Sequence, residues 1–371
     1  MDAATESRLI SSITRPTLLL DEARTRHNIA RMVQKARRNN IRLRAHFKTH
    51  QSAQVGGWCH ELGIEAITVS SVKMAEYFAT HGWSDITIAF PVNWREIDVL
   101  NRLASEIDLG LLVEAVETVN FLAETLKHPV NVWLDVDAGY RRTGIEWDDV
   151  DTAKAVVEAI QRSPEVFTLK GMLTHAGNSY EARSPEELQA VYDLTVTRFT
   201  SLRDALGIPL ELSIGDTPCS SVVEDLSAVD EIRPGNFVYY DVMQVIIGSC
   251  GWNDIAVALA CPVVAKYPQR NEIVIHGGGV HLSKDTFVDR QGRKIFGMIA
   301  LPEGDGWGEV LEGSYVKSLS QEHGVIAADQ ETFDRIQVGS LVMVLPVHSC
   351  MTADLMKTMT TLTNDTVRMM V

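Results

Sequence analysis

Short strand-like segments alternate with longer amphipathic segments through the first two-thirds of the chain. The strand-like segments are rich in apolar and β-branched residues and cover residues 42–47, 66–70, 85–89, 109–113, 131–137, 167–174, 210–214 and 229–232. Segments with helical periodicity lie between them, over residues 21–39, 71–81, 93–106, 115–126, 148–162 and 184–206. Strands separated by helices pair in parallel through right-handed crossovers. Eight such strands in succession favour a (β/α)8 TIM-type barrel over an open sheet.

The sequence pattern changes after about residue 250. Helical patterns give way to short apolar segments such as IAVALACPVVAKY, EIVIHGG and LVMVLPVHSC, separated by Gly, Pro, Asp and Asn. This pattern is typical of a mostly antiparallel β domain. The segment PTLLLD at residues 16–21 fits a strand of either domain. We predict an α/β chain in which residues 17–250 form the barrel, while residues 1–16 and 251–371 form the β domain.

Composition and charge argue against some classes of binding partner and indicate a cellular location. The 371 residues are 45% hydrophobic and 22% charged, as in a globular protein. Their 34 basic and 49 acidic residues give a net charge of −15, which disfavours a nucleic-acid partner. The N-terminus lacks a signal-peptide pattern, and no apolar stretch is long enough to span a bilayer. Five scattered cysteines indicate a reducing compartment. We therefore expect a cytoplasmic protein without nucleic-acid or membrane partners.

A lysine stands at the end of the first predicted strand, in the segment RLRAHFKTH. Residues two apart on an extended segment share a face, so His46, Lys48 and His50 would point the same way. Barrel enzymes carry their reacting groups at such strand ends. Desolvation and nearby positive charge would lower the pKa of Lys48, as imine formation requires. A solvated lysine would give the same pattern, so the spacing alone leaves both interpretations open.

The next two strand ends carry weaker candidates. In WLDVDAGYRRTG, Arg141 or Arg142 could bind an anionic oxygen, while Gly139 and Gly144 allow close backbone approach. In LTHAGNSY, His175 is either a structural residue or a catalytic one. Similar strings occur in ordinary turns, so neither segment is specific alone.

The seventh and eighth predicted strands end in glycine-containing turns, SIGDTPCS and EIRPGNFVYYD. Such turns expose backbone N–H groups that cradle phosphate, and the loops after strands seven and eight are the usual phosphate site of barrel enzymes. Together with Lys48 they describe a barrel that holds a phosphorylated aldehyde cofactor.

The segment PVHSCMT places His348 and Cys350 two residues apart on a predicted strand. Both side chains would then face one direction and could chelate a borderline-soft metal such as zinc. A buried free cysteine beside a polar histidine is the alternative. Two more His-containing stretches, HGGGVHLSKD at residues 276–285 and SLSQEHG at residues 318–324, either line the site or turn the chain.

These segments resemble the fold-type III pyridoxal phosphate (PLP) enzymes, which are alanine-racemase-like barrels, and specifically their D-serine dehydratase and D-threonine aldolase branch. The resemblance runs from RPTLLLD through HFKTH, DVDAGYRRTG, SIGDTP and RPGN to PVHSC. HFKTH and HSC together are its specific part. IHGGGVHLSKD departs from both groups, because it is richer in His and Gly, and this leaves the substrate's identity open.

The resemblance implies roles for particular residues. It implies a PLP imine on Lys48, with Arg142 near the pyridine O3′ and His175 beside the cofactor, and these three are the candidate catalytic residues. It also implies that the cofactor's phosphate is held by the two glycine turns, at Gly215, Asp216, Thr217, Gly235 and Asn236. Tyr180 and Tyr239 are further candidates for cofactor binding. A divalent metal would bind His348 and Cys350, with zinc ahead of manganese and magnesium. The resemblance also implies a homodimer whose sites contain residues of both subunits.

These parts predict a lyase acting on D-3-hydroxy amino acids. PLP would act as electron sink and Lys48 as base, while the metal binds the substrate's β-oxygen. A metal there can help hydroxide leave, giving a 2-oxo acid and ammonia, or favour retro-aldol cleavage to glycine and an aldehyde. The His/Cys pair resembles the dehydratases more, so dehydration of D-serine- or D-threonine-like substrates is the predicted function. D-threonine aldolase activity is the alternative.

Two further alternatives stay open. An amino-acid racemase would use Lys48 and a second-domain tyrosine such as Tyr315 as opposing bases, but it would give the His–Cys pair no role. A non-catalytic PLP-binding protein would resemble the barrel alone.

Overall fold

A parallel sheet of eight strands surrounds the core of the N-terminal part of the chain. The computed structural model describes residues 8–289 and 291–371. The strands, in sheet order, are β2 (Arg42–Leu43), β10 (Glu231–Ile232), β9 (Glu211–Ile214), β8 (Phe167–Thr174), β6 (Val130–Asp137), β5 (Asp108–Val113), β4 (Asp85–Pro91) and β3 (Ile67–Val69). The circuit closes where His46 bridges Thr68. The predicted (β/α)8 barrel is therefore confirmed. A short strand, β7 (Ile145–Glu146), pairs with β6.

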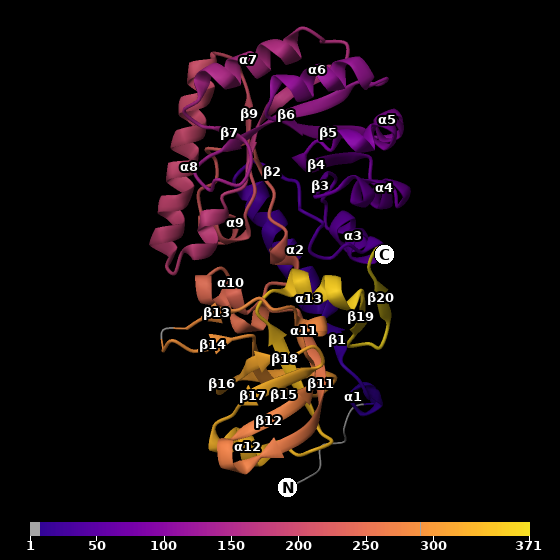
Figure 1. Cartoon of the computed structure of the whole chain (residues 1–371), viewed down its shortest axis with the longest axis vertical. Helices are drawn as coiled ribbons and strands as arrows, with labels where there is room; N and C mark the ends of the chain where they lie inside the picture. The colour runs from indigo at the N-terminus through magenta and orange to yellow at the C-terminus, as the bar shows by residue number, and fades with distance from the viewer. Residues whose placement is uncertain (1–7, 290) are drawn as a thin grey trace.

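Helices cover the outside of this barrel (Figure 1). The longer ones are α2 (Glu22–Arg38), α3 (Ala53–Glu61), α4 (Val72–Thr80), α5 (Ile97–Glu106), α6 (Val116–Thr125), α7 (Val150–Gln161) and α8 (Pro185–Leu206). Several begin where the sequence supplies a capping side chain: Asp21 accepts a hydrogen bond from the backbone N–H of Arg24, and Ser184 from that of Glu187. Short elements at the strand ends are η1 (Trp94–Glu96), η2 (Gly177–Glu181), α9 (Thr217–Val222), η3 (Asn236–Val238), α10 (Val242–Ile247) and η4 (Trp252–Asp254).

The second sheet is almost entirely antiparallel. Its strands are β1 (Thr17–Leu20), β11 (Val257–Tyr267), β12 (Glu272–His276), β15 (Gly297–Glu303), β16 (Gly306–Leu319), β17 (His323–Ala327), β18 (Leu341–Pro346), β19 (Thr358–Thr361) and β20 (Thr366–Arg368). Six of them, β12-β17-β16-β15-β18-β11, close on themselves through the β11–β12 pairing. A separate hairpin joins β13 (Phe287–Val288) and β14 (Lys294–Ile295), and the short helices are α1 (Arg8–Ser12), η5 (Pro268–Arg270), α11 (Gly279–Leu282), α12 (Gln330–Arg335) and α13 (Ser349–Met356).

Strand β1 corrects one boundary of the predicted domains. Residues 17–20 were assigned to the barrel, yet β1 pairs with β11 and β19 of the second sheet. The chain therefore begins in the second sheet and crosses to the barrel at Asp21, where α2 starts. The rest of the division, with its boundary at residue 250, stays a prediction.

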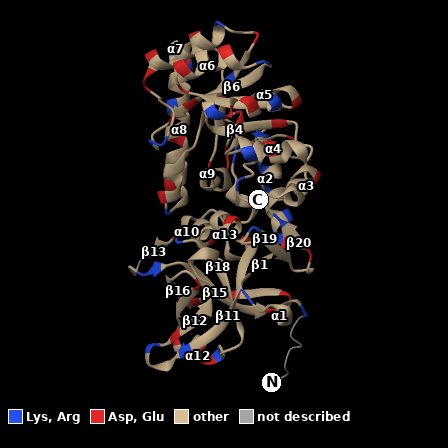
Figure 2. Ribbon diagram, turned by 45° about the vertical axis from the view of Figure 1, so that its right-hand side comes forward, with Lys and Arg blue, Asp and Glu red and all other residues tan. Residues whose placement is uncertain are grey.

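The barrel interior is filled below its open end. Leu112, Trp133 and Leu173, from β5, β6 and β8, form a small buried cluster of their own. Inward-pointing apolar side chains of this kind make a barrel a packed core with a site only at its C-terminal face. In the view of Figure 2, acidic and basic residues are interspersed over the ribbon. Among the described residues, no helix is long and apolar enough to cross a membrane.

Candidate active site

A cavity of about 450 Å³ opens at the C-terminal ends of the barrel strands, where α13 of the second part faces them. Its lining includes nearly all predicted site residues, namely Lys48, Arg142, His175, Tyr180, Gly215, Asp216, Thr217, Gly235, Asn236, His348 and Cys350. Tyr239 is the exception, because its fully buried side chain does not line the cavity. Residues more than 300 positions apart in sequence, such as Thr49 and Cys350, meet here: Thr49 Oγ1 lies 3.2 Å from Cys350 Sγ.

Lys48 lies in a turn that follows the bridge residue His46, and its side chain is open to the cavity. Desolvation by the surrounding walls lowers the pKa of Lys48; the nearby Cys350 thiol opposes this shift, while Arg142 and Arg233 add to it. A depressed amine pKa increases the neutral, nucleophilic fraction at physiological pH. The environment of Lys48 therefore suits imine formation and proton transfer.

The geometry expected around Lys48 is wrong in one respect. Strand β2 ends at Leu43, and residues 47–50 form a turn, so the alternation of an extended strand does not apply. His46 lines the cavity, and its Nδ1 accepts a hydrogen bond from the Lys48 backbone N–H at 3.4 Å. His50 points into the core, where its ring packs 4.3 Å from that of Phe47.

The two glycine turns lie side by side at one end of the cavity. The backbone N–H of Asn236 donates to Thr217 Oγ1 at 3.1 Å and joins the turns. Asp216 caps α9 by accepting a hydrogen bond from the Cys219 N–H at 2.6 Å, and burial raises the pKa of its carboxyl group to about 6. Gly235 has no room for a side chain, because a Cβ atom there would lie 2.8 Å from the His46 carbonyl oxygen. The turns thus form a rigid, backbone-lined cradle.

His175 stands beside this cradle as a neutral imidazole. Its Nδ1 forms a short hydrogen bond with the Gly215 carbonyl oxygen, which requires a proton on Nδ1 and leaves Nε2 unprotonated. Desolvation, with Arg142 as the next cause, lowers the pKa of His175 to about 3. Tyr140 and Tyr180 flank the ring, with centroids 5.7 and 6.1 Å away. His175 can therefore accept a hydrogen bond from a ligand but carries no charge at neutral pH.

Arg233 is a site residue that the sequence analysis missed. Its buried guanidinium lines the cavity and donates to Ser213 Oγ at 2.7 Å and to the Thr174 carbonyl oxygen at 2.5 Å. Desolvation lowers its pKa to about 10, and the group stays cationic at neutral pH. Its signal was its position directly before the PGN turn, one residue after β10 ends.

His348 and Cys350 also meet at the cavity, although not on a strand. Strand β18 ends at Pro346, His348 is the N-cap of α13, and Cys350 lies in its first turn. Burial raises the pKa of the Cys350 thiol, but the hydrogen bonds with His348 and Thr49 and the charge of His348 together outweigh burial, so the pKa is lowered. Desolvation opposes charge on His348, yet Asp285 and Cys350 raise its pKa to about 11. The two side chains therefore stabilise each other's charged forms.

The His348 ring is oriented as metal-binding histidines commonly are. Its Nδ1 lies 2.7 Å from Asp285 Oδ2, which leaves Nε2 for a ligand. A nitrogen and a sulfur donor form a set that zinc accepts, and water or substrate would complete the coordination. His276 and His281, which the sequence left open as lining residues, are not in the cavity wall.

The cavity also fits an anionic cofactor. Lys48, Arg142 and Arg233 all line the cavity. Desolvation is the largest cause of the lowered pKa of His46, and the positive charge of these three side chains lowers it further. A ligand that carries a phosphate group would offset their repulsion. Within the described residues, the buried Asn236 Oδ1 and Asp216 Oδ2 atoms have no hydrogen-bond partner, as expected beside a polar ligand. A phosphorylated aldehyde that bonds to Lys48 matches this donor set.

Comparisons with known proteins agree with this site. Residues 20–242 match the family model of the alanine racemase N-terminal domain, and residues 256–362 match a serine dehydratase domain. The D-threo-3-hydroxyaspartate dehydratase of Delftia sp. (strain HT23) is 30% identical over 351 residues, or 91% of each chain. Its solved structure covers 98% of this chain and 99% of its own, with a TM-score of 0.90, and a variant was solved in the metal-free form.

Two further relatives extend the comparison. The D-serine dehydratase of Dictyostelium discoideum is 27% identical over 96% of this chain and 95% of its own. The D-threonine aldolase of Arthrobacter sp. is 22% identical over 91% of this chain and 86% of its own.

The fold and the cavity define a class, the alanine-racemase-like barrels of fold type III, whose expected cofactor is PLP. This chain belongs to the alanine racemase N-terminal domain family, in the branch that also carries a serine dehydratase domain. Its curated relatives at 27–30% identity are dehydratases, and the chain is accordingly an enzyme of the lyase class. The family matches extend to residue 362, beyond the barrel, which removes support for a non-catalytic barrel-only protein.

Proposed function

We propose that this protein is a PLP- and divalent-metal-dependent dehydratase of D-3-hydroxy amino acids, which forms a 2-oxo acid and ammonia. The observation that carries the proposal is the meeting of Lys48 with the His348–Cys350 pair in one cavity. A racemase needs two opposing bases and has no use for a nitrogen–sulfur donor pair. The matches to D-serine and D-threo-3-hydroxyaspartate dehydratases along nearly the whole chain support the same class of substrate.

Each part of the cavity has a distinct task in this proposal. Lys48 would hold the PLP aldehyde carbon, and the turns at Gly215–Thr217 and Gly235–Asn236 its phosphate, with Arg142 and Arg233 adding positive charge beside the ring. PLP supplies an electron sink that stabilises negative charge at Cα. A Lys48 amine of lowered pKa that is not bonded to the cofactor would act as the base that takes the Cα proton.

His348 and Cys350 would hold the metal that acts on the β-hydroxyl. Nε2 of His348 and Sγ of Cys350 would bind a Lewis-acidic ion, and Asp285 would fix the ring that presents Nε2. A Lewis acid held there would polarise the substrate's β-oxygen and so make hydroxide a better leaving group. The thiolate and imidazole donors favour zinc, because manganese and magnesium prefer oxygen ligands.

D-Threonine aldolase activity is the second candidate. The same metal could instead favour loss of the β-hydroxyl proton and cleavage of Cα–Cβ, giving glycine and an aldehyde. The match to a D-threonine aldolase at 22% identity supports this second candidate. The higher identity to the dehydratases favours dehydration.

We also propose a cytoplasmic homodimer whose active site contains residues of both subunits. The location is supported by the five cysteines, all of which are free thiols. The dimer is supported by the resemblance to the alanine-racemase-like enzymes. Light scattering of the purified holoenzyme should give twice the chain mass of 41.1 kDa.

One experiment tests the function directly. The holoenzyme with zinc is given D-serine, D-threonine and D-threo-3-hydroxyaspartate in separate assays. We expect 2-oxo acid and ammonia in equal amounts. Glycine and aldehyde would instead establish the aldolase, and a change in substrate chirality without either product would establish a racemase.

Replacement of Lys48 tests the cofactor attachment. We expect Lys48→Ala to abolish the visible absorption band of lysine-bound PLP and to lower turnover by about 10³-fold or more, because both the attachment and the base are lost. Lys154→Ala is a matched control, since Lys154 is exposed on α7 and lies outside the cavity. A retained absorption band in the Lys48 variant would refute the assignment.

Removal of the metal tests the second half of the site. We expect EDTA or Cys350→Ala to remove dehydratase activity while the PLP absorption band persists, because the metal acts on the β-oxygen and not on the cofactor's attachment. Added zinc should restore the EDTA-treated enzyme but not the variant. Turnover that is unchanged in metal-free enzyme would contradict the assignment.

A further inference from the structure

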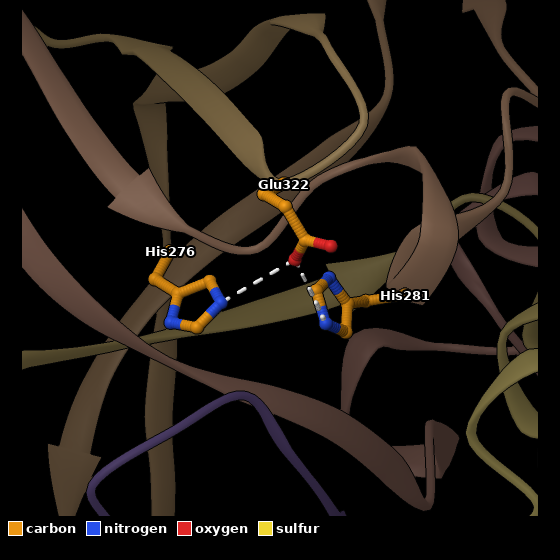
Figure 3. Close-up of side chains that lie close together, drawn as sticks. All are labelled: His276, His281 and Glu322. Atoms are coloured by element: carbon orange, nitrogen blue, oxygen red, sulfur yellow. Dashed lines mark ion pairs between the residues drawn. The ribbon is translucent and has the colours of Figure 1, made fainter.

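Three side chains of types that can bind metal ions lie together outside the active-site cavity (Figure 3). His276 ends β12, His281 lies on α11, and Glu322 lies in the turn between β16 and β17. One carboxylate oxygen of Glu322 is 3.4 Å from His276 Nε2 and 3.7 Å from His281 Nε2. An ion with bonds of about 2.1 Å at tetrahedral angles separates its ligands by about 3.4 Å. All three donors lie within 4.8 Å of one another, close enough for small side-chain shifts to place them around one shared ion.

The backbone holds this cluster in place. Gly277 N–H donates to the Glu322 carbonyl oxygen at 2.9 Å, and Gly279 N–H donates to that of Ser320 at 2.8 Å. At Gly278 a Cβ atom would lie only 2.2 Å from the Gln321 carbonyl oxygen, so only glycine allows this approach. The HGGGVH segment is thus docked on the turn that carries Glu322, and the donors are brought together without a bound ion.

The charges leave room for a cation. Among the described residues, Glu322 forms no ion pair with Lys or Arg and faces only the two imidazoles. Desolvation lowers the pKa of His281, and the charge of Glu322 opposes that shift. The negative charge of Glu322 is therefore not neutralised by a permanently charged side chain, and a bound cation would neutralise it.

We propose that His276, His281 and Glu322 form a second divalent-metal site, of the zinc type and completed by water. Two histidine nitrogens and one carboxylate oxygen are a donor set that zinc accepts, and it differs from the nitrogen–sulfur pair of the active site. The side chains of His276 and Glu322 are 40% and 49% exposed, so an ion and its water ligands can reach them from solvent.

Binding changes the tautomer of His281. Its Nδ1 accepts a hydrogen bond from the Gly278 N–H at 3.2 Å, which places the ring proton on Nε2 in the metal-free protein. Ligation through Nε2 moves that proton to Nδ1 and breaks this contact. The affinity is therefore lower than that of a closed four-ligand site.

The site would stabilise the segment that supports the active site. Leu282, the residue after His281, accepts a hydrogen bond from Thr352 Oγ1 of α13 at 3.3 Å. Asp285, three residues further on, holds the His348 ring at 2.7 Å. An ion on His281 thus anchors the chain just before the residue that orients His348.

Cobalt(II) uptake by the dialysed holoenzyme tests the site. We expect two ions per chain, of which one gives a near-ultraviolet thiolate-to-cobalt band and disappears in Cys350→Ala. The other should lack a sulfur band, and its affinity should fall by about tenfold or more in His276→Gln and in Glu322→Gln. His323→Gln is the matched control, because exposed His323 is paired with His276 across β12 and β17 but lies outside the cluster.

The results separate this proposal from the proposed function. Uptake that is unchanged in both His276→Gln and Glu322→Gln, with Cys350→Ala alone reducing it, would overturn the second site and leave the active-site metal intact. Loss in the His276 and Glu322 variants, with none in Cys350→Ala, would support the second site and count against the first. Melting temperatures of the metal-free variants should match that of the metal-free wild type, and cobalt should raise the melting temperature of Cys350→Ala but not of Cys350→Ala with His276→Gln.

Discussion

Lys35 carries a buried charge far from the catalytic chemistry. Lys35 is only 5% exposed, and its ammonium group donates a hydrogen bond to the Ser221 carbonyl oxygen at 2.7 Å. The carboxylate of Glu224 lies 3.9 Å away but is itself solvent-exposed. Desolvation therefore dominates and lowers the pKa of Lys35 to about 8. The folded state holds this proton less tightly than the unfolded chain does, which costs stability wherever the lysine is charged.

We expect Lys35→Met to raise the free energy of unfolding at pH 7 by about 1–2 kcal/mol, with the lost Ser221 hydrogen bond offsetting part of the gain. The unfolded lysine titrates near 10.4, so between pH 8 and that value the unfolded wild type binds more protons, and wild-type stability rises with pH. The advantage of the variant should therefore shrink from pH 7 to pH 10. Denaturant titrations at both pH values measure it, and a difference that does not change with pH would contradict the lowered pKa.

The site residues differ in how far the sequence could predict them. Lys48 was found from its place at a strand end, although the reason given, an extended strand with His50 on the same face, is wrong. The turn at residues 47–50 ends with Gln51 at a φ of 43°, a conformation that no residue in HFKTH signals. Arg233 was missed because a single sequence does not distinguish a buried, hydrogen-bonded arginine from a surface one.

Within the barrel, β8 and β9 approach each other unusually closely at Gly171. The residue is paired with Glu211, and a Cβ atom on Gly171 would lie 2.1 Å from the Glu211 carbonyl oxygen. That oxygen belongs to the backbone of the neighbouring strand and cannot move away alone. The glycine therefore sets the distance between two strands whose ends carry His175 and the phosphate-binding turn.

We expect Gly171→Ala to lower the free energy of unfolding by about 3 kcal/mol, because the strands must separate to admit the methyl group. Gly57→Ala is the control: it lies in α3, has open space around it, and should stabilise by about 0.5–1 kcal/mol through helix propensity. Thermal and urea unfolding of both variants measure the difference. Equal stability of the two variants would show that β8 and β9 tolerate separation.

The elements were more predictable than their ends. All eight barrel strands lie within or close to the predicted segments, since apolar runs between helices determine them. The helix at residues 53–61 was missed because AQVGGWCHE contains adjacent glycines, which weaken a helical pattern. Tertiary contact explains one of them: a Cβ atom on Gly56 would lie 3.3 Å from the Phe47 ring. The sequence also extended the last strand to Cys350, whereas the chain turns into α13 after Pro346.

On the scale of the whole molecule, the two sheets are tied by chain crossings at both ends. Strand β1 lies in the second sheet, while α2, which follows it, covers the barrel. Near the C-terminus, the Met370 N–H donates to the Gln51 carbonyl oxygen at 2.7 Å, beside the Lys48 turn. A four-residue apolar strand carries no information about its partner, so the sequence could not assign β1 to a sheet. The two parts are therefore joined directly where β1 runs into α2, and again by the C-terminal hydrogen bond beside the Lys48 turn.

This arrangement predicts that the two sheets unfold together, although chains of this length often unfold in separate steps. Leu19 in β1 is fully buried, and Leu19→Ala should lower the free energy of unfolding by about 3 kcal/mol through the cavity it creates. Because β1 runs directly into α2, which covers the barrel, the loss should appear equally in the barrel. Hydrogen exchange in denaturant, read from peptides of β6 and of β18, measures both parts in one sample. Faster exchange in β18 with unchanged exchange in β6 would contradict the coupling. Equal acceleration in both strands would show that the two sheets on either side of the cavity unfold as one cooperative unit.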